Sequence, residues 1–123
     1  MKKVLIIEDN ADNMKLITFI LTKNGYQAIE AFSGQEGINM TLQELPDLVL
    51  LDIQLPDMDG IEVLTAIRRS KTDGKPPIVA VTSYAMSGDR QRLLAAGCTG
   101  YIEKPINPET IMQEIRRYMG EQA

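Results

Sequence analysis

Three short, mostly branched apolar runs recur along this chain, and polar groups follow each of them directly. The runs are Val4–Ile7, Leu48–Leu51 and Ile78–Val81. Such runs are typical of strands that are buried on both faces of a sheet. Because a buried strand reaches the surface where its apolar run stops, the polar residues that follow are held at a rigid edge.

The groups that follow these runs are suited to binding a cation. Glu8 and Asp9 follow the first run, Asp52 follows the second, and the hydroxyls of Thr82 and Ser83 follow the third. If the three strands are neighbours, three carboxylates and a hydroxyl converge at one edge of the sheet. Crowded carboxylates repel one another, and a hard divalent cation with oxygen ligands offsets that cost. We therefore expect a divalent metal site at this edge.

Helix signals alternate with the strand signals. The expected strands are Val4–Ile7, Tyr26–Ala31, Leu48–Asp52, Ile78–Val81 and Gly100–Glu103. The expected helices follow Asn10, Ser33, the turn at 54–60, Ser87 or Gly88, and Asn107. The clearest helix start is the last, where an N-cap Asn107 precedes Pro108 and Glu109. This alternation predicts an α/β fold, with a five-stranded parallel sheet covered by helices on both faces and a ligand site beyond the carboxyl ends of the strands.

The size and composition exclude several classes of function. A chain of 123 residues fits one domain, and we expect residues 1–123 to form a single domain without repeats or linkers. A net charge of -4 and a pI near 4.8 argue against direct binding of nucleic acid, which depends on clustered Lys and Arg. The first apolar run is too short for a signal peptide or a membrane span, so we expect a cytoplasmic protein without membrane contact.

The absence of histidine limits the chemistry further. The chain has no histidine and a single cysteine, Cys98. It therefore cannot supply an imidazole metal ligand, a Ser-His triad or a phosphohistidine of its own. Cys98, between Gly97 and Thr99, is expected to be a small packed residue. Any chemistry must use carboxylates, hydroxyls and lysine.

Four motifs in order resemble the receiver domain of response regulators in two-component signalling. They are Val-Leu-Ile-Ile-Glu-Asp-Asn at 4–10, Leu-Leu-Asp-Ile-Gln-Leu-Pro-Asp-Met-Asp-Gly at 50–60, Ala-Val-Thr-Ser at 80–83 and Tyr-Ile-Glu-Lys-Pro at 101–105. The resemblance spans nearly the whole chain and is close to single-domain receivers and to receiver modules of hybrid histidine kinases. It implies a flavodoxin-like (βα)5 fold with the strand order 2-1-3-4-5.

The resemblance also implies roles for particular residues. Asp52 matches the phosphoacceptor, and Glu8, Asp9, Asp52 and the backbone carbonyl of Gln54 match the ligands of magnesium (Mg²⁺). This set suits the ion, which prefers oxygen ligands in octahedral geometry.

Other positions match the residues that respond to the phosphoryl group. Thr82 and Lys104 match the hydroxyl and the lysine that contact its oxygens, and Tyr101 matches the switch aromatic. Lys104-Pro105 matches the cis peptide of the family.

The resemblance implies a signalling protein and not an enzyme, apart from catalysis of its own phosphorylation and dephosphorylation. The expected donor is a histidine kinase or a histidine phosphotransfer protein, since the chain has no histidine. Phosphorylation is expected to change the surface of the fourth helix, fifth strand and fifth helix, and a downstream protein target would bind there.

Two other classes of function share some of these features. Aspartyl-nucleophile phosphatases also place an Asp after a strand, but they usually carry a second acid two residues later, where this chain has Gln54. An interaction module that is never phosphorylated would be indicated by loss of Asp52, Thr82 or Lys104, and none of them is lost. The segment Asp57–Gly60 lacks the later acid of an EF-hand calcium loop, and a turn explains it better.

Tyr84 provides a first prediction, because it matches a position that modulates hydrolysis in the family. Its bulk is expected to hinder the attacking water, so Tyr84→Ala should shorten the lifetime of the phosphorylated protein. Decay of the phosphorylated form can be followed after the phosphodonor is removed. Faster decay in the wild type than in Tyr84→Ala would contradict this prediction.

Overall fold

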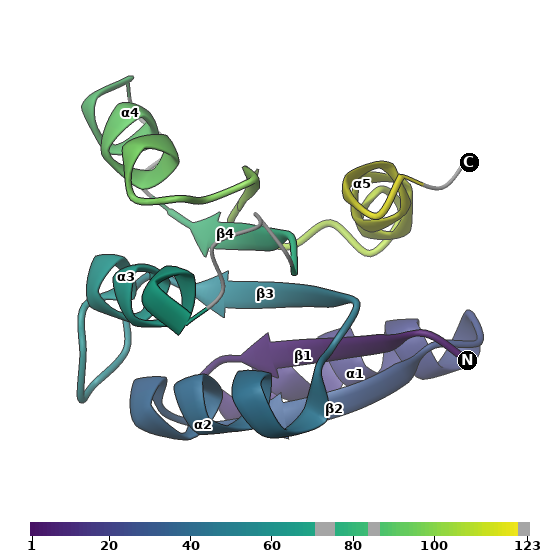
Figure 1. Ribbon diagram of the computed structural model, residues 1–123. Coiled ribbons are helices and arrows are strands. Elements are labelled where there is room, and N and C mark those ends of the chain that lie inside the picture. Colours follow the sequence, from purple (N-terminus) through teal and green to yellow (C-terminus); the bar gives the residue numbers. More distant parts are fainter. Residues whose placement is uncertain (71–75, 84–86, 121–123) are drawn as a thin grey trace.

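Five parallel strands form the centre of the molecule in the computed structural model, which describes residues 1–70, 76–83 and 87–120 (Figure 1). The strands are β1 (Lys3–Ile7), β2 (Gln27–Ala31), β3 (Leu48–Asp52), β4 (Ile78–Thr82) and β5 (Gly100–Glu103). The helices are α1 (Ala11–Lys23), α2 (Gly34–Glu44), α3 (Gly60–Ser70), α4 (Ser87–Ala95) and α5 (Ile111–Tyr118). The strand order is β2-β1-β3-β4-β5, which confirms the predicted α/β fold.

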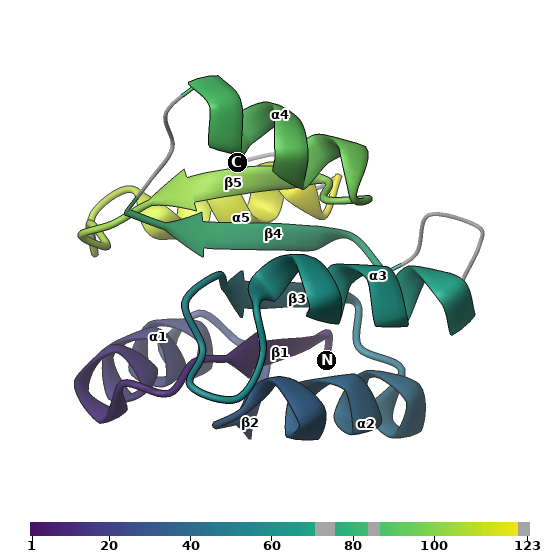
Figure 2. The same cartoon turned by 90° about the vertical axis from the view of Figure 1, so that its left-hand side faces the viewer.

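The strands are apolar throughout because helices cover both faces of the sheet. On one face, Val4, Ile6, Leu48 and Leu50 pack with residues of α1 and α5. On the other face, Leu5, Ile7, Val49 and Leu51 pack with residues of α2, α3 and α4. Figure 2 shows α2, α3 and α4 in front of the strands and α5 behind them. Successive residues of each strand therefore face opposite layers of helices.

Two helix starts follow the predicted caps. The side chain of Asn10 accepts the N–H of Asn13 at 2.9 Å, and the hydroxyl of Ser33 accepts the N–H of Glu36 at 3.2 Å. Each bond satisfies one of the N–H groups that a first helical turn leaves without an intrahelical partner.

The regular part of the last helix begins later than the sequence predicts. Asn107 does accept the N–H of Glu109 with its side chain, at 2.9 Å. Its carbonyl, however, accepts both Thr110 N–H at 3.2 Å and Ile111 N–H at 3.0 Å. This sharing makes residues 108–110 a tight turn, and regular helix geometry begins only at Ile111.

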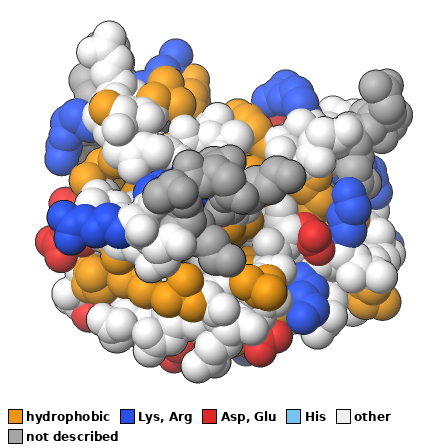
Figure 3. All heavy atoms as spheres, viewed as in Figure 1, with side chains coloured by type: hydrophobic (Ala, Val, Ile, Leu, Met, Phe, Trp, Pro, Cys, Tyr) orange, Lys and Arg blue, Asp and Glu red, His pale blue; other side chains and the backbone are white. Residues whose placement is uncertain are grey.

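One face of the molecule carries mixed charges and separate apolar patches. On the face in Figure 3, hydrophobic side chains form several separate patches, and basic and acidic groups both occur between them. Within the described ranges, no helix is long and apolar enough to cross a membrane.

The loop after β3 depends on a glycine at the start of α3. A Cβ on Gly60 would lie 2.8 Å from Ile53 Cα and 2.7 Å from Ile53 Cδ1, so the loop backbone would have to move. We predict that Gly60→Ala lowers the free energy of unfolding by about 1–3 kcal/mol through overpacking. Urea denaturation would measure this, with Ser70→Ala at the exposed end of the same helix as control. Equal stability of the two variants would argue against a tight contact at Gly60.

Candidate functional site

The parallel register brings the predicted site residues to one edge of the sheet. Ile7 lies opposite Leu51, Asp52 opposite Val81, and Thr82 opposite Glu103. The residues that leave β1, β3, β4 and β5 therefore surface next to one another.

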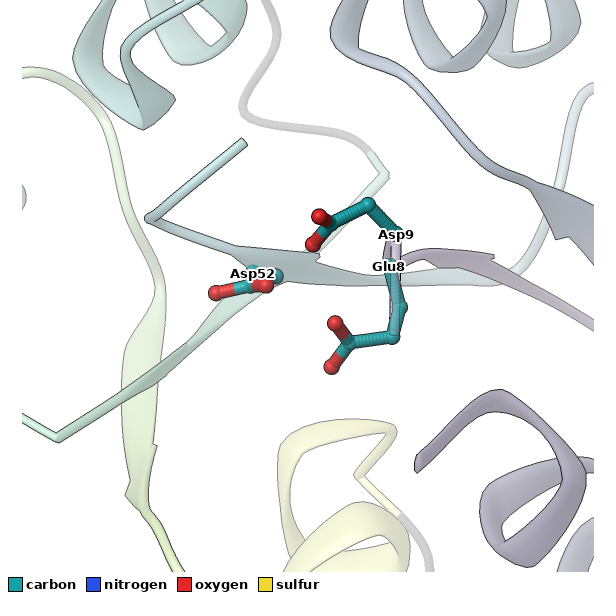
Figure 4. Close-up of side chains that lie close together, drawn as sticks. All are labelled: Glu8, Asp9 and Asp52. Atoms are coloured by element: carbon teal, nitrogen blue, oxygen red, sulfur yellow. The ribbon is translucent and has the colours of Figure 1, made fainter. Parts of the chain in front are cut away.

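Three carboxylates meet at this edge. Glu8 and Asp9 follow β1, Asp52 ends β3, and one carboxylate oxygen of each lies within 4.8 Å of the others. Figure 4 shows the three carboxylates turned toward a common space, with Glu8 and Asp9 on opposite sides of the strand end. Glu8 and Asp52 are only 2% and 3% exposed, whereas Asp9 is exposed. The predicted cluster is thus present, and two of its three carboxylates are buried.

Lys104 supplies positive charge to this cluster. Its Nζ lies 3.1 Å from Asp52 Oδ1 and 3.7 Å from Glu8 Oε1. Its backbone N–H donates to the carbonyl of Thr82 at 2.9 Å, and the Lys104-Pro105 peptide is cis, as the resemblance to receiver domains implies. Lys104 is therefore fixed at the edge by its backbone while its side chain contacts two acids.

The carboxylate of Asp52 is oriented by two donors on the same oxygen. Oδ1 accepts Lys104 Nζ at 3.1 Å and the backbone N–H of Gln54 at 3.0 Å. Gln54 is itself held by a bridge to Asp59, within the loop between β3 and α3. Asp52 therefore has a fixed position at the end of its strand.

Glu8 is the group most perturbed by this environment. Burial, followed by hydrogen bonding to Asp52, raises the pKa of Glu8 from 4.5 to about 7. The N–H of Asn10, 3.1 Å from Glu8 Oε2, and the charge of Lys104 act in the opposite direction. The amide of Asn13 also lies 3.5 Å from Glu8 Oε1. Without a cation, Glu8 therefore holds a proton up to about neutral pH.

Thr82 and Tyr101 lie on the side of the sheet that α4 covers. Thr82 is 3% exposed at the end of β4, and Tyr101 packs at the edge of the core formed with α3 and α4. The Arg90 guanidinium of α4 lies 4.5 Å from the centroid of the Tyr101 ring, and Tyr118 donates its hydroxyl to the Tyr101 carbonyl at 3.3 Å. Tyr101 is thus in contact with α4 and α5. Tyr84 lies outside the described residues.

Sequence patterns did not indicate the contacts of Asn13, Arg90 and Tyr118. Asn13 and Tyr118 occupy ordinary helical positions, and Arg90 lies in a polar stretch of α4. Asn13 contacts Glu8 only five residues earlier, but no residue pattern marks that contact, and the partner of Arg90 and Tyr118 is Tyr101 of β5.

The donor atoms at this edge fit a hard divalent cation. Three carboxylates within 4.8 Å provide oxygen ligands and an excess of negative charge. Mg²⁺ and Ca²⁺ both prefer such ligands, whereas zinc sites are usually built with nitrogen or sulfur.

The comparison with protein families agrees with this geometry. Residues 4–116 match the family described as the response regulator receiver domain. The chain belongs to the response-regulator receiver family. Receivers are signalling domains of two-component systems, so the acidic edge, the lysine and the buried threonine are parts of a receiver.

Similar response regulators match this chain over nearly its whole length. The polar-differentiation response regulator DivK of Brucella ovis is 39% identical over 120 residues, covering 98% of both chains. DivK of Brucella anthropi is 38% identical over the same share.

Solved structures agree in fold. The chemotaxis protein CheY4 of Vibrio cholerae has a TM-score of 0.90 at 29% identity, covering 96% of this chain and 98% of that chain. A CheY-like receiver of Methanospirillum hungatei has a TM-score of 0.89 at 32% identity, covering 98% of this chain and 94% of that chain. These likenesses confirm the flavodoxin-like order of the strands.

The raised pKa of Glu8 predicts a pH-dependent stability in the absence of metal. The folded protein keeps a proton that the unfolded chain releases above pH 4.5, so this stabilisation is complete below pH 4.5 and is lost as the pH rises through about 7. Relative to Glu8→Gln, the wild type should lose about 3 kcal/mol of unfolding free energy between acidic and alkaline conditions. Urea denaturation in EDTA across this range measures the difference. Parallel pH profiles for the two proteins would contradict it.

Proposed function

We propose that this receiver accepts a phosphoryl group on Asp52 and stores it as a signal. The observation that carries the proposal is the buried, oriented carboxylate of Asp52, with Lys104 Nζ at 3.1 Å and two acids within 4.8 Å. A carboxylate held in this way is a positioned nucleophile.

In the proposed step, a carboxylate oxygen of Asp52 attacks the phosphorus of a phosphohistidine. The new O–P bond forms as the P–N bond breaks, and the imidazole leaves with the bonding electron pair. Because residues 1–123 contain no histidine, the proposed donor histidine lies outside them, on a histidine kinase or a histidine phosphotransfer protein.

The acidic edge is the proposed Mg²⁺ site. Glu8, Asp9, Asp52 and the backbone carbonyl of Gln54 would hold the ion, a set of oxygen donors that suits its chemistry. Bound there, Mg²⁺ would neutralise charge on the carboxylates and on the incoming phosphoryl group. A solved receiver of the sensor histidine kinase PA1611 from Pseudomonas aeruginosa, similar in fold with a TM-score of 0.87, is described with a magnesium ion coordinated in its active site cleft.

Lys104 and Thr82 are the proposed contacts of the phosphoryl oxygens. Lys104 already pairs with Asp52, and Thr82 ends the neighbouring strand. Movement of Thr82 toward the phosphoryl group would change the space available to Tyr101 on the same side of the sheet. The face of α4, β5 and α5 would then bind a downstream protein target.

The proposed activity is limited to the chain's own phosphorylation and dephosphorylation. The second acid of an aspartyl phosphatase is replaced by Gln54, so no general acid follows the nucleophile at that position. We further propose that residues 1–123 act as one domain in the cytoplasm, by protein contact and without binding nucleic acid or membrane.

The proposal predicts that acetyl phosphate with MgCl₂ adds one phosphoryl group to the wild type. Asp52→Asn should show no addition, and EDTA should prevent it, whereas Asp47→Asn, a control outside the site, should be modified like the wild type. Intact mass spectrometry gives the measurement. An unmodified wild type would favour an interaction module that is never phosphorylated, and rapid multiple turnover to inorganic phosphate would favour a phosphatase.

A further inference from the structure

Asp57, in the loop between β3 and α3, bonds this loop to the start of α2. Its Oδ1 accepts the N–H of Gly34 at 2.8 Å, and its Oδ2 accepts the N–H of Gln35 at 3.0 Å. These two N–H groups open α2, and the next one, of Glu36, is taken by Ser33. Asp57, from a distant part of the chain, therefore completes the N-terminal cap of α2.

The charge of Asp57 suits this contact. The N–H groups of Gly34 and Gln35 hold the pKa of the Asp57 carboxyl below its usual value. The N-terminal end of a helix also favours negative charge. The ionised side chain thus links the loop to α2 at neutral pH.

Packing beside this contact brings the loop and the helix close together. A Cβ on Gly34 would lie 3.1 Å from both Met58 Cβ and Met58 Sδ, and 3.0 Å from Val63 Cγ2. A side chain at position 34 would require Met58 and Val63 to shift, so the residue after Asp57 packs closely against the first turn of α2.

The two ends of the loop are also bonded to each other, next to β3. Gly60 N–H donates to the Ile53 carbonyl at 3.1 Å, Ile61 N–H donates to Asp59 Oδ1 at 2.8 Å, and Gln54 bridges to Asp59. Gln54 therefore sits in a short closed loop whose outer side is held by Asp57.

We propose that Asp57 is a positioning residue for the metal site, because it fixes the loop backbone that carries the Gln54 carbonyl. This inference rests on the proposed function, in which that carbonyl is a ligand of Mg²⁺. Mg²⁺ demands near-ideal octahedral geometry, so a loop free to move would present the carbonyl less often in the required direction. Groups that orient a ligand typically change metal affinity by 10-fold or more when they are removed.

The test is calorimetric titration of the full chain with MgCl₂ in the absence of phosphodonor. Asp57→Ala is expected to weaken Mg²⁺ binding by about 10-fold. Asp57→Asn, which keeps one acceptor oxygen, should lie between the alanine variant and the wild type. Ser33→Ala is the matched control, because it removes the other cap of the same helix end and leaves the loop contact intact. Glu62→Gln controls for the loss of one negative charge nearby.

The outcomes separate a positioning role from a structural one. Weaker binding in Asp57→Ala, with near wild-type affinity in Ser33→Ala and Glu62→Gln, supports the proposal. Equal losses in Asp57→Ala and Ser33→Ala would overturn it, since helix stability alone would then explain both. Equal losses in Asp57→Ala and Glu62→Gln would also overturn it, in favour of a general charge effect.

If the wild type binds Mg²⁺ and Asp57→Ala binds it equally well, only this inference fails. Absence of binding by the wild type would instead overturn the proposed metal site itself.

Discussion

Negative charge crowded at the buried end of the sheet is the constraint on which the site depends. Glu8 and Asp52 are almost fully removed from solvent, and Asp9 lies beside them. Burial raises the cost of each charge, because water no longer stabilises it. Lys104 and a proton on Glu8 offset part of that cost, and a divalent cation bound to the oxygen donors would offset more of it.

The stability of the apolar core offsets the free-energy cost of burying acids at this edge of the sheet. The side chains of Leu48–Leu51 are completely buried, as are those of Ile78–Ala80. Burial of apolar surface stabilises a fold by about 25 cal/mol per Å². The two helical layers therefore support the sheet, and the acids occupy the end of β3 and the two positions after β1. The apolar side chains that stabilise the fold thus lie along the strands, and the candidate site lies at their carboxyl ends.

Local patterns in the sequence were sufficient for the strands and the acidic cluster, but not for the contacts between elements. Apolar runs ending in polar groups predicted both the order of elements and the meeting of Glu8, Asp9 and Asp52. The start of α5 was placed too early, because a shared carbonyl at Asn107 has no signature in residue type. The bonds of Asp57 to α2 span more than 20 residues and join two turns whose closeness only the folded sheet creates.

The alternation of side chains along each strand constrains where in the sequence the residues of this site must stand. Glu8, Asp52 and Lys104 continue the face packed by α1 and α5, whereas Asp9, Thr82 and Tyr101 continue the opposite one. A slip of one residue in any strand would exchange these faces and move a residue of the candidate site to the opposite side of the sheet. The spacing between the core of each strand and its terminal polar residue is therefore as much a part of the site as the residues themselves. Insertions and deletions within a strand should be less tolerated than many substitutions.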